Sequence, residues 1–313
     1  MAEHGLPTTF LSQRDPRMID AVLPLVLLDF ERFRILDRSL QTFHECLGAF
    51  WIVTRDDQYQ EMKRRLKGHP AQLLPESAII PEFYQNKRVG GWHRQQLVKL
   101  AMSRIVGSEV YLTLDADVIC TRPIRENDLI HDGKARTYRY RSTNHDEWYR
   151  HASRVLGVTP SKWRHAVTPT LLTREGVARL AAYLKRRYVT GILARLDRQL
   201  KWEIQPTVPH NWREVLITSL PWTEYSLYHT FLEQKGLIDR FHSQLENPLS
   251  NHNLWGTNPE PFHDWDPALA FDQSADHCFT VIQSRSNIPP ERILEKVEPY
   301  LQSARKKRPV QFS

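Results

Sequence analysis

Two aspartates one residue apart follow an apolar segment and have the chemistry to bind a metal ion. The segment Tyr111–Leu114 leads directly into Asp115-Ala116-Asp117. Side chains two residues apart in an extended chain share a face, so both carboxylates can converge on one point. Carboxylate oxygens suit hard cations such as Mg²⁺ or Mn²⁺, which often bind substrate phosphates as well. The pair predicts a metal site for a phosphorylated ligand; the simpler interpretation is a turn with two solvated Asp.

The residues before this pair alternate between strand and helix patterns. Apolar runs predict buried strands over residues 21–28, 49–54, 78–80 and 109–114. Apolar residues at helical spacing predict helices over 31–47, from 61 onward, and over 94–105. This alternation predicts an α/β fold, with a mostly parallel Rossmann-type sheet flanked by helices. Ligands of such sheets bind where the strands end, which is where Asp115 and Asp117 fall.

The second half of the chain is less regular. We expect strands over 167–172 and 279–283, and helices over 174–201, 227–235 and 289–304. No repeat, low-complexity tract or linker divides the chain, so a single domain is the simplest organisation. The ends, 1–17 and 305–313, have the composition of flexible arms.

Several function classes are excluded by missing motifs. The chain has only 12 Gly, and neither Gly-x-Gly-x-x-Gly nor Gly-x-x-x-x-Gly-Lys-[Ser/Thr] occurs in it. Dinucleotide oxidoreductases and P-loop NTPases depend on those glycine-rich phosphate cradles. The three Cys are widely spaced and lack a Cys-x-x-Cys zinc pattern, which favours a reducing compartment. Any phosphate in the sheet would therefore be bound through a carboxylate-held metal.

The chain carries a formal net charge of +7, which favours an anionic partner without identifying it. Two basic clusters, 185–201 and 305–308, together carry more positive charge than the whole chain, so the rest is slightly acidic. The longest apolar run, 21–28, is too short to span a bilayer, and we see no signal peptide. We expect a cytoplasmic protein. Peripheral contact of the basic clusters with the anionic inner face of the membrane stays open, as does a solvated helix face.

The acidic pair and its flanking sequence resemble the bacterial GT-A glycosyltransferases that have an Asp-x-Asp motif and poorly defined substrates. The resemblance covers roughly residues 20–300 and rests on four segments: 90–100 (GGWHRQQLVKL), 111–117 (YLTLDAD), 222–228 (WTEYSLY) and 281–284 (VIQS). It implies a GT-A domain in which 18–130 bind a nucleotide-sugar and 131–304 bind the acceptor. The implied activity is sugar transfer, from a UDP-linked donor to a glycan or lipid-linked acceptor in cell-envelope polysaccharide synthesis.

The same resemblance implies a metal centre with Mn²⁺ or Mg²⁺. Asp117 would bind the metal directly, and Asp115 would contact the donor ribose or a metal-bound water. His277, just before the late strand, would be the third ligand, although a surface or core histidine is the plainer interpretation.

Donor and acceptor contacts are implied for six further residues. Asp29 and Asp56, at the ends of the first two strands, would contact uracil and ribose, or would simply cap helices. Gln95 and Lys99 share a helical face and would bind the donor; a solvated lysine is the alternative. Trp92 would stack on base or sugar, or lie in the core. Glu224 would be the general base, or a first-turn Glu favoured by the helix dipole.

Two other functions remain open. Asp115-Ala116-Asp117-Val118 also fits the first motif of haloacid-dehalogenase-like phosphatases, although that motif normally lies near the chain start. A non-catalytic protein that binds an anionic polymer through the basic clusters is the other alternative. We do not expect nucleic acid as the partner, because aromatic residues do not interleave with the basic runs.

Overall fold

The structure is a computed structural model, and it describes residues 18–84, 89–142, 146–165, 167–190, 211–219, 221–258 and 260–307. The arms 1–17 and 308–313, and residues 191–201 of the expected long helix, lie outside these residues. The fold is α/β, as predicted, with a mostly parallel central sheet flanked by helices.

Five strands form the central sheet. In sheet order they are β10 (Thr170–Thr173), β4 (Val110–Thr113), β1 (Ile19–Pro24), β2 (Leu47–Thr54) and β3 (Gln72–Pro75). The pairs β4–β1, β1–β2 and β2–β3 are parallel, and β10 pairs antiparallel with β4. The four parallel strands therefore end at one common edge, where the chain places Asp29, Asp56 and Asp115.

Alternating side chains of the central strands enter two separate hydrophobic cores. Ala21 and Leu23 of β1 pack on one face with Leu112 of β4, whereas Val22 and Tyr111 pack on the other. Successive side chains of a strand point to opposite faces, so a strand buried on both faces is mostly apolar. This is why β1 and β4 are largely apolar in the sequence; their buried polar residues, Asp20 and Thr113, have hydrogen-bond partners.

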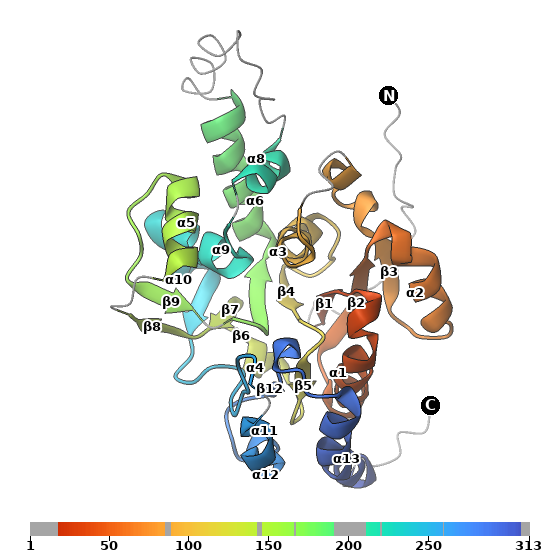
Figure 1. The fold of residues 1–313 in the computed structure, drawn as a ribbon. Helices are drawn as coiled ribbons and strands as arrows, with labels where there is room; N and C mark the ends of the chain where they lie inside the picture. Colours follow the sequence, from red (N-terminus) through yellow and green to blue (C-terminus); the bar gives the residue numbers. More distant parts are fainter. Residues whose placement is uncertain are drawn as a thin grey trace.

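Helices cover both faces of the sheet (Figure 1). One face is packed by α1 (Phe30–Phe43), α2 (Tyr59–Arg65) and α13 (Pro290–Lys307). The other is packed by α3 (Gly91–Ala101), α5 (Glu147–Leu156), α6 (Arg174–Leu184), α8 (Trp212–Thr218), α9 (Glu224–Gln234) and α10 (Ile238–Phe241). Figure 1 shows α13 alongside α1, and an ion pair between Arg38 and Glu298 joins these two helices from opposite ends of the described chain.

Three small sheets and three one-turn helices complete the fold. The sheets are β5 (Val118–Cys120) with β12 (Phe279–Val281), β8 (Arg139–Arg141) with β9 (Trp163–His165), and β11 (His242–Gln244), β7 (Lys134–Thr137) and β6 (Ile130–His131). The short helices are α4 (Glu126–Leu129), α11 (Pro261–Asp264) and α12 (Pro267–Ala270). The β5–β12 pair brings the last strand beside the residues that follow Asp117.

One expected strand is wrong and another is shorter than expected. Residues 78–80 are not a strand: Glu76–Ala78 form a 3-10 helix, η4, and the third strand lies earlier, over Gln72–Pro75. The apolar residues Ile79 and Ile80 are buried in the same hydrophobic core as the residues of α3, although they do not lie in a strand. An apolar run that is buried therefore does not by itself identify a strand. The first strand ends at Pro24 because the chain turns into the 3-10 helix η2 (Leu27–Asp29).

In the second half, the expected strand and helices are present with shifted ends. The strand near 170 is β10, and it is antiparallel to its neighbour. The helix that begins at residue 174 keeps α-helical bonding only to Leu184 and continues as a π-helix over Lys185–Thr190. Of the second basic cluster, Arg305 donates to Thr42 Oγ1 on α1 at 2.9 Å.

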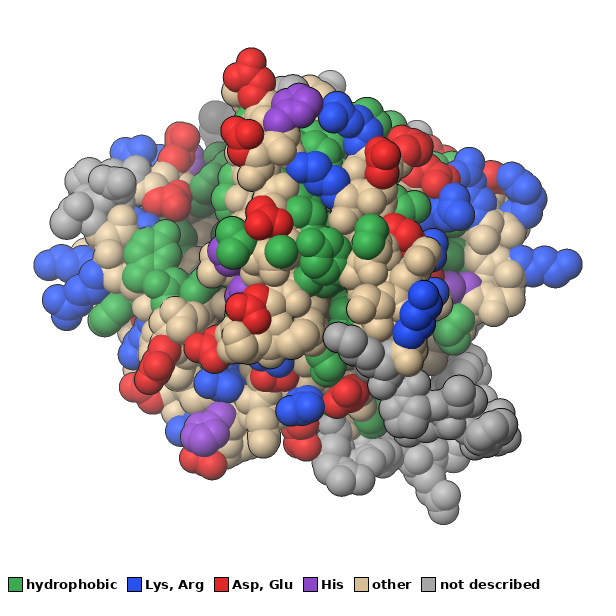
Figure 2. Space-filling model, turned by 90° about the horizontal axis from the view of Figure 1, so that it is seen from below, with side chains coloured by type: hydrophobic (Ala, Val, Ile, Leu, Met, Phe, Trp, Pro, Cys, Tyr) green, Lys and Arg blue, Asp and Glu red, His purple; other side chains and the backbone are tan. Residues whose placement is uncertain are grey.

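Charge on the face seen in Figure 2 is mixed. Acidic, basic and hydrophobic side chains are interspersed there, without a broad area of one sign among the described residues. In the same part of the chain, no helix is long and apolar enough to cross a membrane.

Three buried histidines from three elements lie against one another beside β10. His165 of β9 stacks on His229 of α9 with ring centroids 4.0 Å apart, and His229 meets His242 of β11 at 5.2 Å. The Tyr228 hydroxyl contacts His242 Nε2 at 2.9 Å, and Glu233 Oε1 lies 3.4 Å from His165 Nε2. Burial lowers the pKa of His165 and of His242 to about 3, and the pKa of His229 falls well below its usual value.

We predict that the protein loses stability on acidification below about pH 6.5. Each of these histidines stays neutral in the fold but binds a proton when the chain unfolds, because the unfolded pKa is about 6.5. The free energy of unfolding should therefore fall between pH 6.5 and 3, by about 1.4 kcal/mol per pH unit for each histidine that stays neutral. Urea unfolding followed by circular dichroism at several pH values measures this slope.

The variant His229→Gln should flatten that slope by roughly the share of one histidine. His131→Gln is the matched control, since the His131 side chain is 66% exposed and should leave the slope unchanged. A wild-type slope that is equally steep in His229→Gln would contradict the assignment.

Candidate active site

A buried lysine lies at the centre of the candidate site. Lys99 of α3 is completely buried, and its ammonium group contacts Asp115 Oδ1 at 2.7 Å, Glu224 Oε1 at 2.8 Å and the Tyr225 hydroxyl at 2.9 Å. Three acceptors thus meet the three N–H groups of the ammonium. The Lys99 carbonyl oxygen accepts a hydrogen bond from the Tyr111 hydroxyl at 3.0 Å. The lysine thereby joins α3, β4 and the start of α9.

The carboxylates keep Lys99 charged despite its burial. Burial by itself would lower the pKa of Lys99, but the charges of Asp115 and Glu224 outweigh it and hold that pKa well above its usual value. Burial raises the pKa of Glu224, and the charge of Lys99 opposes that rise. The Lys99 ammonium thus faces two carboxylates, those of Asp115 and Glu224. Of these three side chains, only that of Asp115 reaches the surface, where it is 30% exposed.

The second aspartate of the pair is fixed by the segment that directly follows the last strand, β12. Asp117 Oδ2 accepts a hydrogen bond from the Ser284 backbone N–H at 2.9 Å, and the Asp117 carbonyl accepts one from Ile282 N–H at 3.1 Å. Burial and the nearby charge of Asp115 raise the pKa of Asp117 to about 6. The charges of Asp115 and Asp117 therefore repel each other at this edge of the sheet.

A third carboxylate and a buried arginine complete this edge. Burial raises the pKa of Asp29, to which the charge of Asp115 also contributes, whereas Arg32 lowers it. Arg32 of α1 is 8% exposed and donates to the carbonyl oxygens of Ile282 and Ile288 at 3.1 and 2.7 Å. The arginine thus holds the segment that carries Ser284 against α1. Asp29 precedes α1 but its side chain makes no capping hydrogen bond, so capping does not explain this residue.

The acidic pair fits a divalent cation held by few protein ligands. Among the described residues, no group of three or more His, Cys, Asp or Glu side chains is arranged to hold a metal. Mg²⁺ and similar ions are often bound by only one or two carboxylates, while waters and phosphates fill the other positions. The negative charges of Asp115 and Asp117 repel each other, and a bound divalent cation would reduce that repulsion.

His277, the expected third metal ligand, does not lie with the acidic pair. Its Nε2 atom contacts the Ala270 carbonyl at 3.1 Å, and its ring lies against His252. The register of β5 with β12 explains this. The strands are antiparallel, with Val281 opposite Val118 and Phe279 opposite Cys120, so His277 lies beyond Cys120, at the end of the pair away from Asp117. The residue that does reach Asp117 is Ser284, the first residue of the 3-10 helix η8 (Ser284–Ser286), which follows β12.

Glu224 also differs from expectation. Its side chain is completely buried and its carboxylate binds Lys99, so in this structure it does not face a substrate as a general base would. Its backbone N–H donates to Gln96 Oε1 at 3.4 Å. Glu224 is a positioning residue for Lys99.

The remaining expected residues lie around the same edge. Asp56 accepts hydrogen bonds from the Ser77 hydroxyl and, at 3.2 Å, from the Tyr84 hydroxyl, so its carboxylate organises the loops after β2 and β3. Gln95 is half-buried. Trp92 is 45% exposed, in the first turn of α3, and is not a core residue.

The sequence reasoning missed Tyr225, which contacts Lys99, and the two residues on the Asp117 side of the site, Arg32 and Ser284. Arg32 lies on the same face of α1 as Leu36, Leu40 and Phe43, and a charged residue within that apolar stripe was a usable signal. Ser284 belongs to the segment 281–284 that resembles the glycosyltransferases, but it acts through its backbone N–H, which no residue type reveals.

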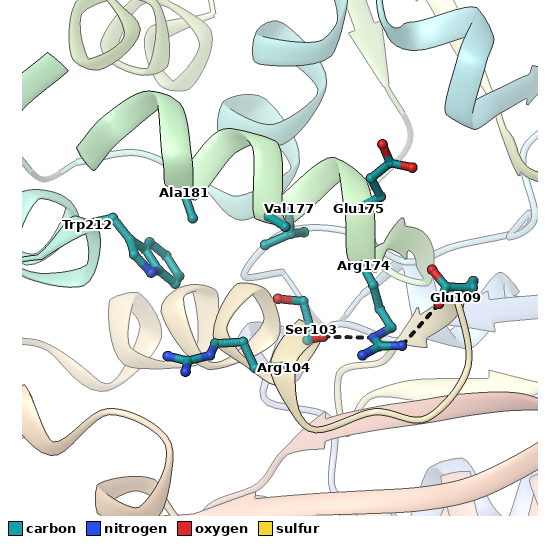
Figure 3. A pocket seen from close by; sticks show the side chains of 9 residues that line it. Ser103, Arg104, Glu109, Arg174, Glu175, Val177, Ala181 and Trp212 are labelled. Atoms are coloured by element: carbon teal, nitrogen blue, oxygen red, sulfur yellow. Dashed lines mark hydrogen bonds and ion pairs between the residues drawn. The ribbon is translucent and has the colours of Figure 1, made fainter. Parts of the chain in front are cut away.

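Figure 3 shows a pocket with a volume of about 620 Å³ whose lining includes none of the acidic-edge residues. It is lined by residues of η6 (Met102–Arg104), α6 and α8, and Arg174 in it bonds to the Ser103 carbonyl and to Glu109. Glu109 immediately precedes β4, so the pocket lies at the opposite end of that strand from Asp115.

Comparison with known proteins gives a family and several distant structures. The model of a family of unknown function, DUF6492, matches residues 16–305. No curated protein matches the chain. Mouse xyloside xylosyltransferase 1 in its apo form is 11% identical with a TM-score of 0.44, over 87% of this chain and 99% of that one.

Two further solved structures are similar at the same level. The galactosyltransferase LgtC, in complex with donor and acceptor sugar analogues, is 11% identical with a TM-score of 0.42, over 94% of this chain and 98% of that one. The apo glycosyltransferase GlyE of Streptococcus pneumoniae is 12% identical with a TM-score of 0.38, over 92% of this chain and 64% of that one. None of these similarities is close enough to assign an activity by itself.

We predict that Lys99→Met destabilises the protein by about 3–5 kcal/mol, because it leaves two carboxylates without their buried cation. Urea unfolding at pH 7 measures the change. Lys63→Met on α2 is the matched control, since Lys63 is exposed and should change the free energy of unfolding by less than about 0.5 kcal/mol.

The double variant Lys99→Met/Glu224→Gln should recover part of the loss, since it removes one of the two uncompensated charges. If the double variant were no more stable than Lys99→Met, the ion pair between Lys99 and Glu224 would not be what holds α3 to α9.

Proposed function

Because the chain belongs to the DUF6492 family of unknown function, we propose its activity from its own residues: it is a glycosyltransferase that takes a sugar from a nucleotide-sugar, with Mn²⁺ or Mg²⁺ bound. The observation that carries the proposal is the acidic pair at the carboxyl edge of the sheet, with Asp115 held by Lys99 and Asp117 held by the Ser284 N–H. Ligands of open α/β sheets bind at that edge.

In the proposed reaction the bond between the anomeric carbon and a phosphate oxygen of the donor breaks. A bond from that carbon to a hydroxyl oxygen of a saccharide or lipid-linked acceptor forms, the nucleoside diphosphate leaves with the bonding electron pair, and the hydroxyl proton passes to water. A divalent cation on Asp117, and on Asp115 directly or through water, would supply the positive charge that the departing diphosphate requires.

The chain's own residues would place these groups. Lys99 restrains the Asp115 carboxylate, and Arg32 with Ser284 restrains Asp117, so both acids keep their positions at the sheet edge. Asp29, which makes no capping bond, is the candidate contact for the nucleoside. UDP is our proposed nucleotide, and cell-envelope polysaccharide synthesis is the proposed role.

A phosphatase of the haloacid-dehalogenase type is the second candidate, because Asp115 is the partly exposed first Asp of the pair. In such an enzyme, Asp115 would be the nucleophile toward a phosphate ester. Its close ion pair with Lys99 reduces its nucleophilicity, which favours the transferase. Hydrolysis of p-nitrophenyl phosphate distinguishes the two functions, since only the phosphatase would release nitrophenol.

We predict that UDP binds in the presence of Mn²⁺ and that Asp117→Asn weakens this binding at least about tenfold, or 1.4 kcal/mol, because it removes a charged metal ligand. Isothermal titration calorimetry with UDP, with and without Mn²⁺, measures the effect. The same assay with GDP and CDP tests the choice of nucleotide.

Asp132→Asn is the matched control, since Asp132 lies 83% exposed in the turn between β6 and β7 and should bind UDP like the wild type. UDP binding that does not depend on Mn²⁺ or Mg²⁺, or that survives in Asp117→Asn, would overturn the proposed metal centre. Release of free sugar from UDP-sugars by the wild type, lost in Asp117→Asn, would support transfer to water in the absence of acceptor.

A further inference from the structure

Two partly exposed tryptophans from distant segments lie together near the candidate site. Trp92 is 45% exposed and Trp148 is 38% exposed, and their ring centroids are 4.9 Å apart with the planes inclined at 49°. Each lies in the first turn of a helix, Trp92 on α3 and Trp148 on α5. Indole rings carry a large apolar area, so leaving two of them at the surface is costly unless something covers them.

The pair lies within reach of the acidic edge. Trp92 precedes Lys99 by seven residues on the same helix, which corresponds to roughly 10 Å along the axis. Helix α9, which begins at Glu224, contacts both α3 and α5, so the two tryptophans and the Lys99 cluster belong to one packed unit. A ligand resting on the indoles could therefore extend to Asp115 with a length of one or two sugar rings.

The chemistry of the surface suits a sugar better than a lipid chain or an apolar peptide. A pyranose ring has a C–H face that stacks on an aromatic ring and hydroxyl groups around its rim. Gln95 lies one turn after Trp92, half-buried, and its amide is able to donate and to accept hydrogen bonds.

We infer that Trp92 and Trp148 form the binding site for the saccharide acceptor. This inference rests on the proposed function, which it extends from the donor to the acceptor. The site needs no metal and no nucleotide, because the indole faces and the Gln95 amide are present in the protein alone. Donor binding at Asp117 and saccharide binding at the tryptophans are therefore separable by experiment.

The test is saturation-transfer difference NMR on the full chain, without nucleotide, with lactose, cellobiose and di-N-acetylchitobiose as probes. We expect saturation of ring C–H protons in at least one disaccharide, and affinity reduced about three- to tenfold in Trp148→Ala, in keeping with 0.5–1.5 kcal/mol for an aromatic contact. Trp148→Phe should retain most of the signal. Trp255→Ala is the matched control, since Trp255 is 48% exposed and lies on a loop outside α3 and α5.

Three results would overturn the inference. They are the absence of saturation with all three probes, an equal signal in Trp148→Ala, and an equal loss in Trp255→Ala. Light scattering that shows a wild-type dimer dissociated by Trp148→Ala would instead assign the pair to self-association. UDP and Mn²⁺ titrations on the same wild-type sample separate the inference from the proposed function. Saccharide contact without UDP binding would overturn the proposed transfer and leave the saccharide site standing. UDP binding without saccharide contact would overturn the saccharide site and leave the proposed transfer standing.

Discussion

The rest of the site depends on one buried ammonium group. Lys99 can remain charged inside the protein only because Asp115, Glu224 and Tyr225 surround it, and these partners come from two other elements, the end of β4 and the start of α9. Burying an ion is expensive, and the expense is recovered only when the geometry of its partners is correct. The lysine therefore fixes how α3, the end of β4 and the start of α9 meet, and with them the direction in which Asp115 faces.

A second set of bonds fixes the other aspartate independently. Asp117 is held by the Ser284 backbone, and the segment around Ser284 is held by Arg32 from α1. One acid is thus restrained from the helix layer on one face of the sheet and the other from the opposite layer. A metal centre with few protein ligands requires this kind of restraint, because carboxylates that were free to move would lose their convergence.

The sequence was sufficient to predict the strands of the central sheet and to single out the acidic pair. It was insufficient where the position of a residue depended on strand pairing or on a partner far away in the sequence. Apolar runs buried on both faces predicted β1, β2 and β4. The spacing of Asp115 and Asp117 predicted that their side chains share a face, which stays a prediction because β4 ends at Thr113 and Asp117 lies in the turn that follows. Residues 78–80 were misread because a short apolar run looks the same in a strand and at the end of a 3-10 helix: η4 ends at the exposed Ala78, and the buried Ile79 and Ile80 follow it. His277 was misplaced because the register of β12 with β5 is set by tertiary contacts, and the burial of Glu224 followed from its partner, Lys99, which lies far away in the sequence.

The packing of α13 on α1 has a consequence for the order in which the protein becomes functional. Arg32 emerges early from the ribosome, but the carbonyl groups that it binds belong to Ile282 and Ile288. Until those residues have been synthesised, neither the Arg32 guanidinium nor the Asp117 carboxylate has its partners. The acidic pair is therefore completed only when translation has passed the last strand and reached Ser284 and Ile288, so any shorter chain lacks the finished site.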